Sequence, residues 1–132
     1  MRIAVLAFVA LVATGCMGRP ANSEGEGDAA PTTALEISVM PGGEAPTKIW
    51  TLRCPSAGNL PDAAQACEQL LQIEDPFAPV PKGASCTQVY GGPQEADVRG
   101  LFRGRPVEAH FDRGNGCEIA RWDKVQFLFP SA

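Results

Sequence analysis

The chain has 132 residues, of which 45% are hydrophobic and 20% charged, and a formal net charge of -4 at pH 7. The basic residues are interspersed with acidic ones and leave no uncompensated basic patch, so we expect no binding to nucleic acid. His110 is the one histidine in the sequence, which excludes a histidine-rich metal site. We expect neither a metal nor a cofactor.

The first residues have the features of an export signal. Arg2 supplies a positive charge, and the apolar run from Ile3 to Val12 is too short to cross a bilayer, which takes about 20 apolar residues. Small residues then lead directly to Cys16, in the order Ala-Thr-Gly-Cys, which resembles the lipobox of bacterial lipoproteins. We predict a signal peptide over residues 1–15 and lipid on Cys16, which would anchor an extracellular protein to the outer face of the cell membrane. The alternative is ordinary secretion, with Cys16 discarded.

Residues 16–33 are rich in glycine, proline and acidic side chains and show no apolar period. Such a segment cannot bury enough surface to offset its ordering entropy, so we expect a flexible tether. The remaining residues, 34–132, are enough for one small domain with one core.

Two periodicities organise this domain. Alternation of apolar and polar residues predicts strands over residues 35–39, 48–54, 96–102, 105–112 and 125–129, with a hairpin turn at Arg103-Gly104. Residues 62–73 are predicted to be the one main helix, with Asp62 as its N-cap and Gln65 completing a capping box. Its apolar stripe comprises Ala63, Ala66, Cys67, Leu70 and Ile73. The prediction is an α+β domain in which this helix packs on an antiparallel sheet of about five strands.

Four cysteines lie in the predicted domain. An even number in an exported domain predicts two disulfides, although sequence alone allows three pairings. Their spacing does not give the short Cys-x-x-Cys pairs of zinc or redox sites. The four residues are Cys54, Cys67, Cys86 and Cys117.

The sequence contains few side chains in arrangements that support catalysis. His110 alternates with Glu108 and Asp112, which predicts a solvent-facing strand residue. There is no glycine-rich loop between a strand and a helix to hold phosphate, and no convincing nucleophile and base pair. We therefore do not expect an enzyme.

The order of strands, helix and cysteines resembles the subtilisin inhibitor-like family, which are small secreted inhibitors of serine proteases. The resemblance covers roughly residues 34–130. The matching pieces are Thr51-Leu52-Arg53-Cys54-Pro55, Ala66-Cys67-Glu68-Gln69-Leu70, Cys86 with Val89-Tyr90, Gly104 to Val107, and Val125 to Phe129. It implies the pairs Cys54–Cys67 and Cys86–Cys117, a subtilisin-like serine protease as the target, and a homodimer formed through the sheet.

The resemblance also implies a reactive-site loop just after the third cysteine. Such a loop occupies the protease cleft like a substrate, and because it already has its bound shape it loses little entropy on binding. Gln88 would be the specificity (P1) residue and Val89 the first residue after the scissile bond (P1′). The whole loop would be Cys86, Thr87, Gln88, Val89 and Tyr90.

The loop sequence departs from the family pattern in three places. Thr87 replaces the usual proline, and Gly91-Gly92 replaces Asp-Pro, and both changes are expected to loosen the loop. Gln88 suits neither an apolar specificity pocket nor one that binds Lys or Arg, because its amide must be desolvated. The alternative function is therefore a non-inhibitory binding lipoprotein of the cell envelope with the same fold.

Overall fold

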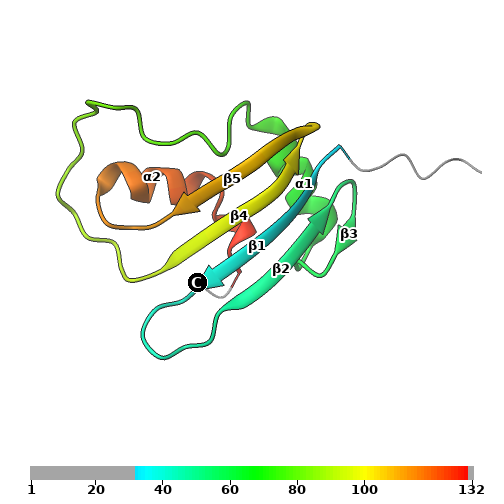
Figure 1. Ribbon diagram of the computed structural model, residues 1–132, viewed down its shortest axis with the longest axis horizontal. Helices are drawn as coiled ribbons and strands as arrows, with labels where there is room; N and C mark the ends of the chain where they lie inside the picture. Colours follow the sequence, from blue (N-terminus) through cyan, green and yellow to red (C-terminus); the bar gives the residue numbers. More distant parts are fainter. Residues whose placement is uncertain (1–31, 131–132) are drawn as a thin grey trace, which may run out of the picture.

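The computed structural model describes residues 32–130. The predicted signal peptide, Cys16 and residues 17–31 of the predicted tether therefore lie outside the described residues. Five antiparallel strands form one sheet in the order β3-β2-β1-β4-β5, and two helices pack on the sheet (Figure 1). The elements are β1 (Ala34–Met40), β2 (Lys48–Arg53), β3 (Ala57–Gly58), α1 (Ala63–Gln72), β4 (Glu95–Phe102), β5 (Arg105–Phe111), α2 (Gly116–Lys124) and the 3-10 helix η1 (Gln126–Leu128). The predicted α+β fold is confirmed.

One face of the sheet forms the core. In β1, Leu35, Ile37 and Val39 are buried, while Glu36 between them is exposed. Ile37 lies opposite Trp50 of β2 and Val98 of β4, so the strands place their apolar residues on the same face. Each fully buried aliphatic side chain contributes about 1.5–3 kcal/mol through loss of contact with water. Helix residues complete this core, with Ala66, Cys67 and Leu70 from α1 and Trp122 from α2 buried against the sheet.

Helix α1 follows the predicted apolar stripe and carries one of the two disulfides. The Cys54–Cys67 bond joins it to the end of β2, and the second disulfide is Cys86–Cys117, so both implied pairings are confirmed. The predicted capping box does not form. Asp62 has left-handed backbone angles, φ 52 and ψ 43, and makes no side-chain cap hydrogen bond. An N-cap carboxylate reaches the first turn from extended backbone, which Asp62 does not adopt.

The predicted final strand, residues 125–129, is wrong. The chain forms α2 over Gly116–Lys124 and then η1 over Gln126–Leu128, and the fifth strand of the sheet is instead the two-residue β3. Val125, Leu128 and Phe129 are all buried under the sheet. A short apolar run of this kind fits a buried strand or a buried helical turn equally well, so alternation alone could not distinguish them.

The β4–β5 turn has the predicted position. Arg103 and Gly104 have φ values of 50 and 76, the pair of positive angles of a tight two-residue hairpin. The Arg103 guanidinium also donates to the carbonyl oxygens of Leu71 and Glu74, the latter at 3.4 Å, and so satisfies carbonyl groups at the end of α1.

The chain joins the sheet beside this turn. The N–H of Gly104 donates to the Thr32 carbonyl at 2.6 Å, and the N–H of Arg103 donates to the Thr33 hydroxyl at 3.1 Å. Thr33 is 1% exposed. Two residues placed by sequence in the tether are thus hydrogen-bonded parts of the fold, at the end of the sheet where β1 begins.

Candidate reactive-site loop

The five predicted reactive-site residues lie in the long segment between α1 and β4. This segment runs around α2 and reaches β4 where Glu95 pairs with Met40, at the far end of β1 from Thr32 (Figure 1). The candidate loop and the point where the chain joins the sheet are therefore at opposite ends of the central strand.

The middle of the loop projects into solvent. Gln88 is exposed, and Val89 and Tyr90 are 56% and 69% exposed. The Gln88 amide nitrogen donates to the carbonyl of Cys86 at 3.4 Å, a bond within the loop itself. Two adjacent, strongly exposed apolar side chains offer contact area to a partner protein.

The N-terminal side of the loop is held to the start of α2. Cys86 is joined by its disulfide to Cys117, and the carbonyl of Thr87 accepts a hydrogen bond from the N–H of Gly116 at 2.9 Å. A Cβ atom on Gly116 would overlap the Thr87 hydroxyl oxygen. A side chain at position 116 would therefore require the Thr87 hydroxyl to move.

The C-terminal side is held by Arg113. The N–H of Gly91 donates to the Arg113 carbonyl at 2.7 Å, and Arg113 Nε donates to the Gly91 carbonyl at 3.1 Å. A Cβ on Gly91 would lie 2.8 Å from Ile119 Cδ1, so the absence of a side chain lets the loop pack closely on α2 here. Gly91, expected to loosen the loop, is therefore fixed by two hydrogen bonds and by contact with α2. The Arg113 guanidinium carbon lies 5.7 Å from the ring centre of Trp122, which is 1% exposed.

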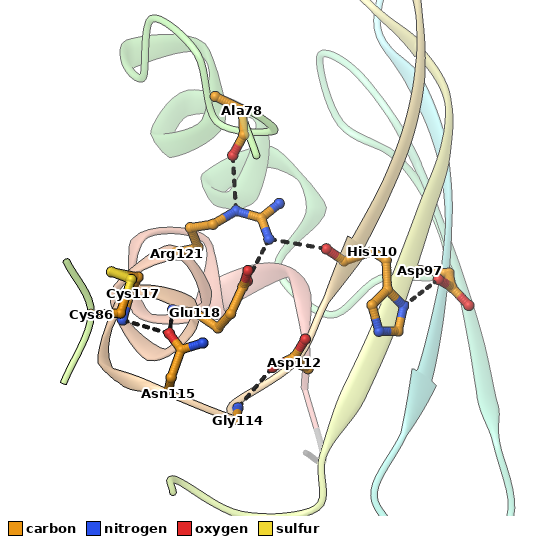
Figure 2. Close-up of polar contacts among 10 residues, drawn as sticks. All are labelled: Ala78, Cys86, Asp97, His110, Asp112, Gly114, Asn115, Cys117, Glu118 and Arg121. Atoms are coloured by element: carbon orange, nitrogen blue, oxygen red, sulfur yellow. Dashed lines mark hydrogen bonds and ion pairs between the residues drawn. A yellow bond between two sulfur atoms is a disulfide. The ribbon is translucent and has the colours of Figure 1, made fainter. Parts of the chain in front are cut away.

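Both sides of the loop are thus attached to one stretch of chain, residues 112–117, which we call the scaffold segment. Local hydrogen bonds shape it (Figure 2). The Asp112 carboxylate accepts from the N–H of Gly114 at 2.7 Å, and the Asn115 side chain accepts from the N–H groups of Cys117 and Glu118 at 2.9 and 3.0 Å. Asn115 is the N-cap of α2, and such caps stabilise a helix by about 1 kcal/mol.

Arg121 connects the segment that leads into the loop with the sheet and α2. Its Nε donates to the Ala78 carbonyl at 2.8 Å, and Nη1 donates to the His110 carbonyl at 3.2 Å and to the Glu118 carboxylate at 2.6 Å (Figure 2). Its side chain is 15% exposed, and the guanidinium carbon lies 4.5 Å from the ring centre of Phe111. The Arg121 side chain thus connects the segment at Ala78 with β5 and α2.

His110 does not belong to this site. Its side chain is exposed on β5, as predicted, and Nδ1 lies 2.8 Å from a carboxylate oxygen of Asp97 on β4. Within residues 32–130, no group of three or more His, Cys, Asp or Glu residues could hold a metal ion. Over the same residues, no helix is long and apolar enough to span a membrane.

The scaffold and the arginines were not predicted from the sequence. A local signal for α2 is present, because Asn115 is followed three residues later by Glu118, the spacing of a capping box, and Trp122 lies at helical spacing from Ile119. Arg113 has no such signal, because Gly91 lies 22 residues away in the chain. Arg121 has a local partner in Glu118, three residues before it, but its bond to Ala78 spans 43 residues.

Comparison with known protein families gives one match. The family model described as subtilisin inhibitor-like matches residues 31–115, more than half of the 132-residue chain. The matched range includes the exposed loop and ends at Asn115, just before Gly116 and Cys117. A search of curated proteins finds no match.

Proposed function

The chain belongs to the subtilisin inhibitor-like family, and from that premise we propose that it inhibits a subtilisin-like serine protease through the loop from Cys86 to Tyr90. Gln88 is the proposed P1 residue and Val89 the proposed P1′ residue. The family consists of inhibitors rather than enzymes, so the protein itself needs no catalytic group.

The attachment of both loop ends to the scaffold segment carries this proposal. The exposed part of the loop comprises Gln88, Val89 and Tyr90. On its N-terminal side the loop is held by the Cys86–Cys117 disulfide and the Thr87 hydrogen bond, and on its C-terminal side by the two Gly91 hydrogen bonds. Fixing the backbone of a residue costs roughly 1–2 kcal/mol, so a loop already fixed over three residues avoids roughly 3–6 kcal/mol on binding. A substrate peptide would have to lose that freedom in the protease cleft.

A titration tests the proposal. The purified full chain, oxidised and kept in mild detergent, is titrated against subtilisin, trypsin and a chymotrypsin-like protease. We expect inhibition at stoichiometric ratios with slow cleavage between Gln88 and Val89. Gln88→Leu and Gln88→Met should strengthen inhibition of subtilisin, because an apolar side chain avoids desolvation of the amide. Gln72→Leu, the same change at an exposed position of α1, is the matched control.

The opposite result would point to a different function. If the wild type and both Gln88 variants leave all three proteases active, or are cut rapidly between Gln88 and Val89, the loop is not an inhibitor. The non-inhibitory binding lipoprotein would then be favoured, and a pull-down from the cell envelope should find a partner that is not a protease.

We further propose export and lipid attachment at Cys16, with the protein on the outer face of the cell membrane. The apolar run ending in small residues before Cys16 supports this proposal. The intact mass of the mature protein should correspond to an N-terminal Cys16 with acyl chains, and Cys16→Ser should move the protein from the detergent phase to the aqueous phase. A mature mass lacking Cys16 would instead indicate ordinary secretion.

The homodimer is also a proposal, through the face of the sheet that carries no helix. Ile49 on this face is 57% exposed, which supplies apolar area for contact with a second copy. Light scattering should give the mass of two chains, and Ile49→Glu should reduce it to the mass of one. A wild-type mass of one chain at micromolar concentration would reject the dimer.

A further inference from the structure

We propose that Arg113 is the positioning residue that keeps the cut end of the loop in place, so that the protease can rejoin it. This inference rests on the proposed inhibitory function and concerns how the two halves of the loop are retained. The contacts that carry it are the hydrogen bond from Arg113 Nε to the Gly91 carbonyl, at 3.1 Å, and the bond from the Gly91 N–H to the Arg113 carbonyl, at 2.7 Å.

The two halves of the loop are held by different means. Cleavage between Gln88 and Val89 leaves the N-terminal half covalently fixed, because Cys86 is bonded to Cys117. The C-terminal half has no such bond before β4 begins at Glu95. Its attachments to the scaffold segment are the two Gly91 hydrogen bonds, and one of them comes from the Arg113 side chain.

The position of the C-terminal half decides whether the cut peptide bond is restored or hydrolysed. The protease serine oxygen bonds to the carbonyl carbon of Gln88 as its hydroxyl proton passes to the protease base. The bond from that carbon to the Val89 nitrogen then breaks, and the base donates the proton to this nitrogen, which becomes an amine. If the amine stays in place, it attacks the acyl carbon and returns its proton to the base, which passes the proton to the departing serine oxygen, and the peptide bond is restored. If the amine moves away, water attacks instead and leaves a carboxylate on Gln88.

The Gly91 hydrogen bonds shorten the free end that carries the amine. With them in place, Val89 and Tyr90 form the free part, and without them the free part extends at most over residues 89–94, up to β4. The effective concentration of a tethered group falls roughly as the -3/2 power of the length of its tether, so a threefold longer free end lowers that concentration about fivefold. The equilibrium ratio of cut to intact loop should therefore rise by the same factor.

The Arg113 side chain is suited to this role because the core holds it. Its guanidinium lies above Trp122, which is buried, so the side chain has little freedom to leave the loop. Methionine at position 113 would keep apolar contact with Trp122 and would lose the Nε donor.

The test uses the full chain carrying Gln88→Leu, which adapts the loop to subtilisin. Each variant is incubated with a small amount of subtilisin until the ratio of cut to intact loop is constant, and the ratio is measured by mass spectrometry. Arg113→Met removes the Nε bond and keeps the bond from the Gly91 N–H to the backbone carbonyl of residue 113, so the ratio should rise by more than about twofold and at most about fivefold over the parent. Arg99→Met, the same change at an exposed residue of β4, should leave it unchanged. Melting temperatures separate loss of loop retention from loss of fold.

Each outcome decides a specific point. A ratio for Arg113→Met within about twofold of the parent, in a chain that inhibits subtilisin, overturns the role of Arg113 and leaves the inhibitory function intact. Failure of the Gln88→Leu parent to inhibit subtilisin overturns both proposals. If Arg113→Met does not fold, Arg113→Lys takes its place. Lysine keeps a charge near Trp122 but has no N–H at the Nε position, so the same rise in the ratio is expected.

Discussion

Removal of the Cys86–Cys117 disulfide should convert the protein from an inhibitor into a substrate. The bond closes a loop with a sequence separation of 31 residues, for which the chain-entropy relation gives about 3.7 kcal/mol of stability at 25 °C. In a domain of this size, such a loss lowers the melting temperature by roughly 15–30 °C. The double variant Cys86→Ala/Cys117→Ala should still fold at low temperature, but its loop loses its covalent attachment to α2.

The other disulfide provides a matched control. It has a sequence separation of 13 residues, which corresponds to about 2.9 kcal/mol. Because Cys67 is 2% exposed, removal of its sulfur adds a packing loss of about 1 kcal/mol. Cys54→Ala/Cys67→Ala should therefore cost nearly the same stability, about 4 kcal/mol, without changing the attachment of the loop.

Urea unfolding and titration against subtilisin in the Gln88→Leu background separate the two effects. At 10 °C, where both variants are mainly folded, the variant lacking Cys54–Cys67 should inhibit like the parent, and the variant lacking Cys86–Cys117 should be cut without lasting inhibition. Equal loss of inhibition in both variants would show that global stability controls the loop. Full inhibition in both would show that the disulfide does not hold the loop in its inhibitory shape.

Three further predictions address single side chains. Gly116→Ala should weaken inhibition about tenfold, because overpacking against the Thr87 hydroxyl costs about 1–3 kcal/mol. Adding Thr87→Ala should recover most of this loss. An unchanged inhibition constant in Gly116→Ala would contradict the close approach of residues 116 and 87. Arg121→Met should reduce the free energy of unfolding in urea by about 2–3 kcal/mol, since it removes the donor to the carbonyls of Ala78 and His110 and the partner of Glu118. Arg99→Met should cost less than about 0.5 kcal/mol, and equal effects of the two changes would reject the Arg121 network. His110→Ala should leave the inhibition constant unchanged and cost less than about 1 kcal/mol of stability, because its contact with Asp97 is exposed. Loss of inhibition in this variant would place His110 in the site.

Much of the fold could be predicted because four strands and one helix bury a single face. The alternation that places Leu35, Ile37 and Val39 in the core is a direct consequence of the period of a strand. Alternation does not distinguish a strand from a helical turn at residues 125–129, because this short apolar segment carries no period that separates the two. Alternation also missed β3, which has two residues and no pattern of its own.

The candidate site also has a part that could be predicted from the sequence and a part that could not. The position of the candidate loop and the two cysteine pairs came from the order of the cysteines through a family resemblance, and not from local periodicity. The hydrogen bonds that hold Gly91 and Thr87 depend on contacts with residues 113 and 116, which the fold brings near. Gly91 shows the consequence, because glycine loosens an isolated chain but here allows close packing against Ile119.

The opposite placement of the loop and Thr32 defines a direction of approach. The chain joins the sheet beside Gly104, and the seven residues of β1 separate that point from the end of the sheet near the loop by roughly 20 Å. A tether from Cys16, as we propose, would therefore enter the domain at its hairpin end. The Gln88–Val89 bond lies at the other end of the sheet, so a protease could bind it without contacting the point where the tether is attached.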